Sequence, residues 1–393
     1  MQTSRVSEVF KAFLLLGLTS FGGPVAHLGY FRTEFVARRK WLSESAYADL
    51  VALCQFLPGP ASSQVGFALG LMRAGPWGAA MAWLAFTLPS AIVLVLFAFG
   101  AAVLDGPIAS GIIHGLKVVA VAIVAHAVWG MARNLCPDNT RAGIALAAVF
   151  AVVFISGPLG QVAAIVLGGL AGLALCRGVA AAAADSEALH FPVSRQVGII
   201  ALGLFGGLLV LLPLLAGMAV WLDITDAFYR SGALVFGGGH VVLPLLEAEV
   251  VQSGWVSADE FLTGYGAAQA IPGPLFTFSA YLGALIPAGG SLLAATLALL
   301  AIFLPGFLLL VGVLPFWNRF RQWQSAQALM RGANAAVVGI LGAALFDPVW
   351  TSAILGPHEF ALALTGFLLL TVWKLPAWAV VIVVALGGVL IAP

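Results

Sequence analysis

Long apolar stretches make up most of the chain, and short polar or charged segments separate them. A helix needs roughly 20 mostly apolar residues to cross a bilayer, and many of these stretches reach that length. The pattern therefore predicts an all-α, polytopic membrane protein. The predicted spans lie near residues 10–30, 77–104, 116–132, 141–155 and 159–176 in the first half, and near 227–246, 291–314, 334–349, 360–372 and 376–391 in the second.

One order of motifs occurs twice. Phe21-Gly22-Gly23 recurs as Phe236-Gly237-Gly238, and Pro58-Gly59-Pro60 recurs as Pro272-Gly273-Pro274. The duplication predicts an N-terminal transporter repeat in residues 1–180, a connector with an additional apolar segment in residues 181–222, and a C-terminal repeat in residues 223–393. Single residues between the motifs also recur in order: Glu34 as Glu249, Trp41 as Trp255, Ser43 as Ser257 and Gln55 as Gln269.

The two copies carry opposite charge. A basic cluster follows the first Phe-Gly-Gly, whereas the corresponding stretch after the second is acidic. Lys and Arg in short loops collect on the cytoplasmic side of a membrane, so the two copies are predicted to lie upside down relative to each other. Inverted repeats of this kind are typical of secondary transporters. The charged residues are Arg32, Arg38, Arg39 and Lys40 in the first copy, and Glu247, Glu249, Asp259 and Glu260 in the second.

Composition narrows the class of protein. The 393 residues are 62% hydrophobic and only 8% charged, whereas a soluble domain carries about 25% charged residues. The net charge of +1 gives no reason to expect nucleic-acid binding. Cys54, Cys136 and Cys176 form no CxxC pattern, so we expect neither a structural metal nor a disulfide framework. No cofactor is predicted, and the sequence does not decide whether the chain forms a homodimer.

The Pro-Gly-Pro motifs interrupt two apolar stretches, 46–72 and 261–286. Proline lacks an N–H group and clashes with the preceding turn, and each flank is too short to span alone. If both motifs cross the membrane, the 17 Lys and Arg divide 11 to 6 at best; if both re-enter, 14 of the 17 lie on one side. We therefore favour re-entrant hairpins. That arrangement requires residues 197–221 to enter and leave on the same side, with a bend at Pro213.

The breaks themselves suggest an anion site. A helix broken inside the bilayer exposes backbone N–H groups at the start of its second half, and these donors bind anions together with the helix dipole. The second halves begin Ala61-Ser62-Ser63 and Leu275-Phe276-Thr277. The alternative is a plain kink. The glycines of Phe-Gly-Gly either line the same site through close backbone approach or allow two helices to cross closely; they are Gly22, Gly23, Gly237 and Gly238.

Several polar side chains near the breaks are further candidates. Gln55 and Gln269 either donate to a bound anion or satisfy carbonyls freed by the break. Lys117 and its counterpart Asn334 begin equivalent spans, and Lys117 either binds a dianion or extends to the membrane interface. The histidines share no metal-binding spacing, and His240, directly after the glycines, is the strongest candidate among them.

Glu34 and Glu249 occupy equivalent positions and are candidates for proton coupling, because burial raises the pKa of a carboxyl group. For Glu34 the alternative is a surface ion pair with Arg38, four residues further on. Glu249 has no basic neighbour in sequence, so the same alternative is weaker there.

The motif pair resembles the signatures of the chromate ion transporter family in its long, two-domain form, over nearly the whole chain. The resemblance implies a multi-pass protein of the bacterial inner membrane that exports chromate, confers chromate resistance and handles related oxyanions such as sulfate. The family's conserved stretches map onto Phe21–Pro24, Glu34, Trp41, Gln55–Pro60, Lys117, Phe236–His240, Glu249, Trp255, Gln269–Pro274 and Asn334.

Three other functions remain open at this point. One is a carrier of sulfate or another oxyanion for which chromate is incidental. Another is a channel. The third belongs to a different class: an intramembrane enzyme acting on an anionic lipid head group, with His27 as base and Glu34 as its orienter. The enzyme predicts that the motifs of only one repeat matter.

Overall fold

The computed structural model describes residues 2–101, 106–155, 157–177, 191–236, 239–286, 292–317 and 323–391. Within these ranges the chain is helical and has no strand, which confirms the all-α prediction. Six helical segments of the described chain are long and apolar enough to cross a membrane, as a polytopic protein requires. They are Ala61–Ala101, Pro107–Leu135, Pro158–Leu175, Arg195–Leu215, Leu292–Phe316 and Gln324–Ala353.

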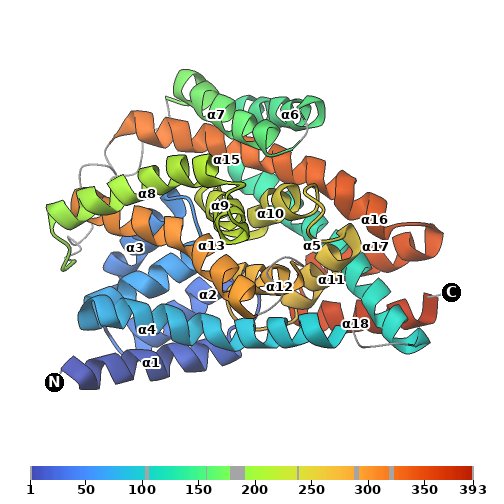
Figure 1. Cartoon of the computed structure of the whole chain (residues 1–393), viewed down its shortest axis with the longest axis horizontal. Helices are drawn as coiled ribbons and strands as arrows, with labels where there is room; N and C mark the ends of the chain where they lie inside the picture. Colours follow the sequence, from blue (N-terminus) through green and yellow to red (C-terminus); the bar gives the residue numbers. More distant parts are fainter. Residues whose placement is uncertain are drawn as a thin grey trace.

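The first half begins with short helices and continues with long ones (Figure 1). The non-helical residues Ala74 and Gly75 divide α4 into a short arm after Pro-Gly-Pro and a long arm that contains Pro89. The helices are α1 (Gln2–Thr19), α2 (Gly23–Phe31), the π-helix η1 (Arg32–Arg38), α3 (Glu44–Phe56), α4 (Ala61–Ala101), α5 (Pro107–Leu135), α6 (Asn139–Phe154) and α7 (Pro158–Leu175).

The second half repeats this order after the connecting helix α8 (Arg195–Leu215). The serines aligned by sequence, Ser43 and Ser257, cap equivalent helices, because each side-chain oxygen accepts a hydrogen bond from a backbone N–H of the first turn. The elements are α9 (Val220–Ala233), η2 (Gly239–Val241), α10 (Val242–Val250), α11 (Ala258–Ala268), η3 (Leu275–Thr277), α12 (Phe278–Leu285), α13 (Leu292–Val313), η5 (Leu314–Phe316), α15 (Gln324–Ala344), η6 (Leu345–Trp350), α16 (Thr351–Ala353), α17 (Pro357–Thr371) and α18 (Ala377–Ile391).

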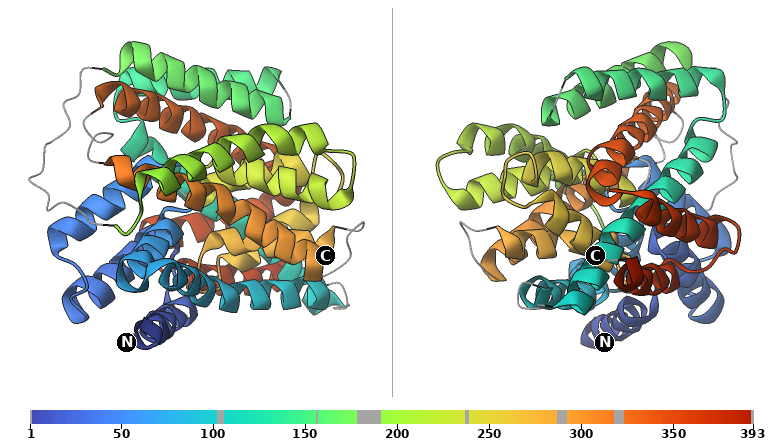
Figure 2. Two further views of the ribbon diagram at one scale, coloured as in Figure 1. Left: turned by 60° about the vertical axis from the view of Figure 1, so that its left-hand side comes forward. Right: turned by 90° about the vertical axis from the view of Figure 1, so that its right-hand side faces the viewer.

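The two halves interlock. Helix α5 of the first half packs against α17 and α18 of the second, and α15 of the second packs against α6 and α7 of the first (Figures 1 and 2). Glycines allow this close approach: a Cβ on Gly388 would overlap the backbone of Gly111 and Gly115, and one on Gly332 would overlap that of Gly168 and Gly172. Small residues let membrane helices approach closely, so the halves are joined through backbone-to-backbone contact.

Two predicted spans are wrong as single helices. The segment 10–30 is broken between α1 and α2, and its flanks meet, because Arg39 Nη1 lies 3.5 Å from Glu8 Oε1. The segment 227–246 is broken between α9 and η2, and Arg230 Nη2 lies 2.9 Å from Glu249 Oε2. Neither segment separates its ends by the roughly 30 Å of a bilayer core. The glycines therefore turn the chain back instead of only bending a span.

The connecting helix also differs from prediction. Helix α8 is continuous over 21 residues, and Pro213 lies in its last turn, two residues before its end. It therefore does not bend back at Pro213. Residues 178–190 of the connector lie outside the described part of the chain. The repeat boundaries and the relative orientation of the repeats stay predictions.

Candidate substrate site at four helix breaks

Four helix breaks, two from each half, meet inside the molecule. The amide of Gly59 donates a hydrogen bond to the carbonyl of Val235 at 2.8 Å, and the amide of Gly273 donates to the carbonyl of Ser20 at 3.0 Å. Ser20 and Val235 each directly precede a Phe-Gly-Gly motif. Each Pro-Gly-Pro turn is thus bonded to the Phe-Gly-Gly break of the other half.

The geometry at these turns requires glycine. Gly59 and Gly273 have φ of +120° and +109°, which L side chains rarely adopt. A Cβ on Gly59 would lie 3.0 Å from Gly306 Cα, and one on Gly273 would lie 2.7 Å from Ser90 Oγ. Gly306 and Ser90 each directly follow the proline inside a long helix, α13 or α4. Each turn therefore packs against the proline-containing helix of the opposite half.

The start of α4 carries a buried polar cluster. The first backbone hydrogen bond of the helix joins Gln64 N to Pro60 O, so the preceding amides are free of intrahelical partners. Ser63 is 2% exposed and Ser20 is 0% exposed, and the hydroxyl oxygen of each has no hydrogen-bond partner among the described residues. Uncommitted buried hydroxyls beside a helix N-terminus are suited to an oxyanion, which accepts hydrogen bonds and favours the positive end of the dipole.

His27 connects the two parts of this cluster. The side chain is fully buried, with Nε2 3.2 Å from the Ser20 carbonyl and Nδ1 3.4 Å from Ser62 Oγ. A carbonyl can only accept, so in neutral His27 the proton is on Nε2 and Nδ1 accepts from the Ser62 hydroxyl. In that state Ser62 has no proton left for an anion. Ser63 and Ser20 are therefore the better donors. Neither the role of Ser20 nor the position of His27 beside the break was predicted from the sequence.

The equivalent turn of the second half is less polar. Thr277 Oγ1 donates to the Pro274 carbonyl at 2.8 Å, and the residues before and after Thr277 are phenylalanines. The hydroxyl predicted to meet an anion therefore satisfies its own helical turn. The two half-sites are alike in backbone geometry but differ in side-chain chemistry.

The glutamines near the turns have different surroundings. Gln55 is exposed, and the Nε2 of Gln269 is buried without a partner within the described ranges. The carbonyl freed by the first break is satisfied instead by Gln64, whose Nε2 donates to Pro58 O at 3.0 Å and to Gly306 O at 2.9 Å. The available sequence signal for Gln64 was an amide side chain in an apolar stretch, six residues after Pro58, whose carbonyl is freed by the break.

The remaining predicted site residues are placed as follows. Lys117 Nζ forms an ion pair with Asp259 Oδ1 of the opposite half at 3.0 Å, so it is not a lone cation. Asn334 Oδ1 is buried and has no partner in the described part of the chain. His240 Nδ1 lies 2.8 Å from the Tyr265 hydroxyl. Gly22 and Gly23 form the first break with φ of +101° and +76°, whereas Gly237 and Gly238 lie outside the described residues.

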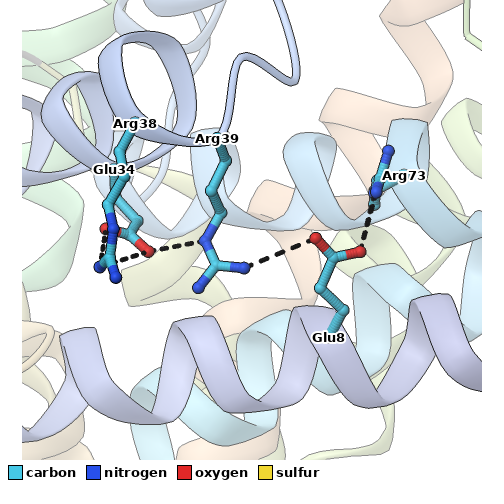
Figure 3. Close-up of polar contacts among 5 residues, drawn as sticks. All are labelled: Glu8, Glu34, Arg38, Arg39 and Arg73. Carbon is cyan, nitrogen blue, oxygen red and sulfur yellow. Dashed lines mark hydrogen bonds and ion pairs between the residues drawn. The ribbon is translucent and has the colours of Figure 1, made fainter.

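Glu34 lies in a basic network at the polar end of the first half (Figure 3). It accepts hydrogen bonds from Arg39 Nε at 2.6 Å and from Arg38 Nη1 at 3.1 Å. Glu8 bridges Arg39 and Arg73, with Arg73 Nη2 at 2.8 Å. Partial burial alone raises the pKa of Glu34, but the bonds from Arg39 and Arg38 outweigh it and hold the pKa below its ordinary value. The ion-pair alternative therefore describes Glu34.

Glu249 is in a different setting, on α10 outside the candidate spanning helices. Its carboxylate contacts Arg230 Nη2 at 2.9 Å, and its side chain is 10% exposed. Burial raises the pKa of Glu249 to about 7, although Arg230 opposes the rise. The equivalent glutamates thus have pKa shifts of opposite sign. Burial dominates at Glu249, where one arginine does not offset it, whereas two arginines outweigh burial at Glu34.

Two further observations concern alternatives and other sites. His27 and Glu34 bond to separate partners and do not form the base and orienter pair of the enzyme alternative. No group of three or more metal-ligating side chains occurs among the described residues.

Two cavities lie away from the four breaks. One, of about 490 Å³, is between α6 and α7, and the other, of about 370 Å³, is beside α5. The second is lined by His126, Trp129, Gly130, Arg133, Asn134 and Thr371.

Comparison with known proteins yields one family. The sequence profile described as "Chromate transporter" matches residues 7–173 and 222–390. The chain is 26% identical to a probable chromate transport protein of Synechococcus elongatus, over 98% of this chain and 95% of that protein. It is 27% identical to chromate transport proteins of Pseudomonas aeruginosa and Cupriavidus metallidurans, over 97% and 100% of this chain and 90% and 94% of theirs. No solved structure matches.

Proposed function

The chain belongs to the chromate transporter family, and from that premise we propose that it is a secondary transporter that exports chromate across the bacterial inner membrane in exchange for protons and thereby gives chromate resistance. The observation that carries the proposal is a pair of buried hydroxyls, those of Ser20 and Ser63, that have no hydrogen-bond partner among the described residues. Ser63 lies in the first turn of α4, where a tetrahedral dianion finds donors and a positive dipole end, and Ser20 is linked to that turn through His27.

The charge distribution around this site favours an anion. The first half places Arg38, Arg39 and Arg73 in one network with only two carboxylates, Glu8 and Glu34. A surplus of positive charge raises the local concentration of anions. The site lies between α2 and α4, at the inner end of the hairpins that start from this network. We assign the basic network to attraction and the hydroxyl cluster to binding.

The membrane potential favours the outward direction. Moving one charge through about 100 mV is worth about 2.3 kcal/mol, so a dianion leaving a negative interior gains about 4.6 kcal/mol. For uptake of the same ion, two coupled monovalent cations only cancel this electrical cost, and more than two are needed before the potential favours entry. Export can therefore be driven by the potential, and a proton moving inward adds to the driving force.

Alternating access follows from the paired breaks. Each turn is bonded to the other half, through Gly59 to Val235 and Gly273 to Ser20. Movement of one half against the other opens one pair of breaks and closes the equivalent pair, as in transporters built from repeats. The occluded Ser20 and Ser63 fit a conformation closed on both sides.

The test is flux into everted vesicles and liposomes that contain the purified protein. We expect chromate to accumulate in vesicles, and an imposed pH gradient, with the lumen acidic, to accelerate the accumulation. Equal or faster flux of sulfate would identify a broader oxyanion carrier. Absence of flux for both ions would reject the proposal. Chromate flux that is not accompanied by proton movement would instead identify a channel or a uniporter.

A further inference from the structure

Arg230 is shared by two carboxylates from two helices. Its Nη2 lies 2.8 Å from Asp226 Oδ2 on α9 and 2.9 Å from Glu249 Oε2 on α10. Its Nε is buried and has no partner among the described residues. The two carboxylates therefore lie within two hydrogen-bond lengths of each other, on a single nitrogen. One positive charge faces two groups that are both negative when ionised.

The cluster is buried, which makes the imbalance costly. The side chains of Asp226 and Glu249 are 8% and 10% exposed, and that of Arg230 is 29% exposed. An unpaired charge away from water carries a desolvation penalty of several kcal/mol. Two carboxylates in one site avoid the penalty when one takes up a proton, and they then titrate as a pair.

The first half lacks this arrangement at the equivalent positions. At the offset of 215 residues that relates Glu34 to Glu249, Asp226 corresponds to Lys11 and Arg230 to Leu15. Arg38 and Arg39, the partners of Glu34, correspond to Ser253 and Gly254. The surplus of carboxylate is thus a property of the second half only.

We propose that Asp226, Arg230 and Glu249 form the proton-binding site of this transporter, with one proton shared between the two carboxylates and Asp226 as an essential member. The proposal rests on the proposed function and names the site of its coupling. Arg230 joins α9 to α10, and the break between them contains Val235, the acceptor of the Gly59 amide. Protonation of one carboxylate weakens its ion pair with Arg230. The contact between α9 and α10 then loosens, and the break between them is free to move.

Other charged groups around the cluster do not supply the missing positive charge. On α9, Asp223 accepts from the Gly217 amide at 2.6 Å. On α10, Glu247 is buried, accepts from Gln252 at 3.2 Å and faces Asp347 of η6. On α15, which packs against α10, Arg331 donates to the Cys176 carbonyl. Of these groups, Asp223 is the one that acts on the triad, and its negative charge adds to the need for a proton at Asp226.

The experiment uses the full chain in liposomes, with two readouts. Chromate exchange without a pH gradient measures transport, and acceleration by a pH gradient measures coupling. We expect Asp226→Asn and Glu249→Gln to lose the acceleration completely, so that the ratio of flux with and without the pH gradient falls to one. Asp226→Glu retains the carboxylate and is expected to keep the acceleration. Glu44→Gln, which removes an exposed partner of Arg32, is the matched control and is expected to behave as the wild type.

Infrared spectra provide a readout that a structural role would not move. A buried, protonated carboxyl group gives a C=O band that disappears as pH rises through neutrality, and buried Glu247, whose pKa burial raises to about 7, contributes to this band in every variant. The part of the band that comes from the shared proton should be present in the wild type and missing in Glu249→Gln. Acceleration that persists in Asp226→Asn overturns the inference and leaves the proposed function intact, and if that variant does not fold, the band and the Asp226→Glu result decide. Wild-type protein that exchanges chromate without any response to pH overturns the inference together with the proton coupling of the proposed function, whereas wild-type protein without exchange rejects chromate transport itself.

Discussion

At the scale of single residues, the hydrogen-bond and ion-pair partners of a side chain determine its chemical role more than its residue type does. Ser62, Ser63 and Thr277 are all hydroxyl side chains at the start of a half-helix. Ser62 lies against His27 and Thr277 donates to its own turn, so only Ser63 of the three is uncommitted. The same holds for Glu34 and Glu249, whose pKa values move in opposite directions, because burial prevails over the one arginine beside Glu249 while two arginines outweigh burial at Glu34.

A first prediction concerns the uncommitted hydroxyl. Ser63→Ala removes a donor to the dianion, and a hydrogen bond to a charged group is worth about 1.5–3 kcal/mol, so KM for chromate should rise roughly tenfold or more. Ser279→Ala is the matched control, because that buried hydroxyl donates to the Phe276 carbonyl in its own helix. The measurement is initial chromate flux in liposomes. Equal KM in the two variants would place the anion elsewhere.

A second prediction concerns pH and stability. Burial raises the pKa of Glu249 to about 7 from its ordinary 4.5, so the folded protein holds a proton that the unfolded chain has released. The stabilisation from this group is complete below its unfolded pKa and is lost as pH rises through about 7. Glu249→Gln should remove that part of the pH dependence of the melting temperature in detergent.

Glu34 provides the opposite case for the same measurement. Its pKa is held below the ordinary value, so its stabilisation is present at neutral pH and is lost as pH falls through the folded pKa. Glu34→Gln should therefore reduce stability at neutral pH and have little effect in acid. If both variants changed the melting curve in the same direction, the assigned environments would be wrong.

At the scale of elements, the breaks are the sites where sequence constrains structure most tightly. Gly59 and Gly273 combine positive φ, a cross-half hydrogen bond and contact with the opposite proline-containing helix. Gly17 and Gly232, on the helices that lead to the breaks, each pack on the backbone of the long helix beside them. The turns at these breaks therefore depend on glycines at the apex and along the arms.

A third prediction tests these turns. Replacing Gly59 and Gly273 together by valine should abolish transport while the protein still inserts into the membrane, because the spanning helices are unaffected and only the turns are strained. Gly143→Val is the control, since a Cβ there meets nothing within 4 Å. Chromate flux and membrane fractionation are the measurements. Normal export by the double variant would remove the turns from the mechanism.

At the scale of the whole molecule, ion pairs between segments that are far apart in sequence indicate how the chain passes through the membrane. Arg73, Glu8 and Arg39 meet at one end of the first half, although a Phe-Gly-Gly break and a Pro-Gly-Pro break lie between residues 8 and 73. Two breaks therefore return to one side, and α8 must cross the membrane for the halves to be inverted. Among the described residues, all Lys and Arg except Lys117 and Arg230 then face the same side, in agreement with the positive-inside rule.

A fourth prediction tests this topology. In a variant without native cysteines, Ser45→Cys should react with an impermeant maleimide only from the cytoplasmic side, and Ser253→Cys only from outside. Both serines are exposed. Ser45 lies in the first turn of α3, and Ser253 lies in the connection that precedes the equivalent helix α11. Labelling of both positions from one side would show parallel repeats, and the paired anion and proton sites would lose their common framework.

The sequence by itself determined the class of protein, the duplication and the position of the four breaks, because each depends on local signals: apolar length, proline and glycine. It identified Ser63 and Gln269 as candidates from their place beside a break, and Glu249 from its equivalence to Glu34. It could not identify Ser20, His27 or Gln64 as members of the site, because their roles depend on contacts with distant or other segments of the chain.

Only the tertiary structure decided which polar groups are already satisfied. Lys117 is not a free cation, because it forms an ion pair with Asp259. Glu249 forms an ion pair with Arg230, which also contacts Asp226. The turn amides of Gly59 and Gly273 are used between the halves. The physical reason is general: local sequence fixes where a backbone or side-chain donor is freed, whereas burial, partner and charge balance depend on which distant helix is packed against it.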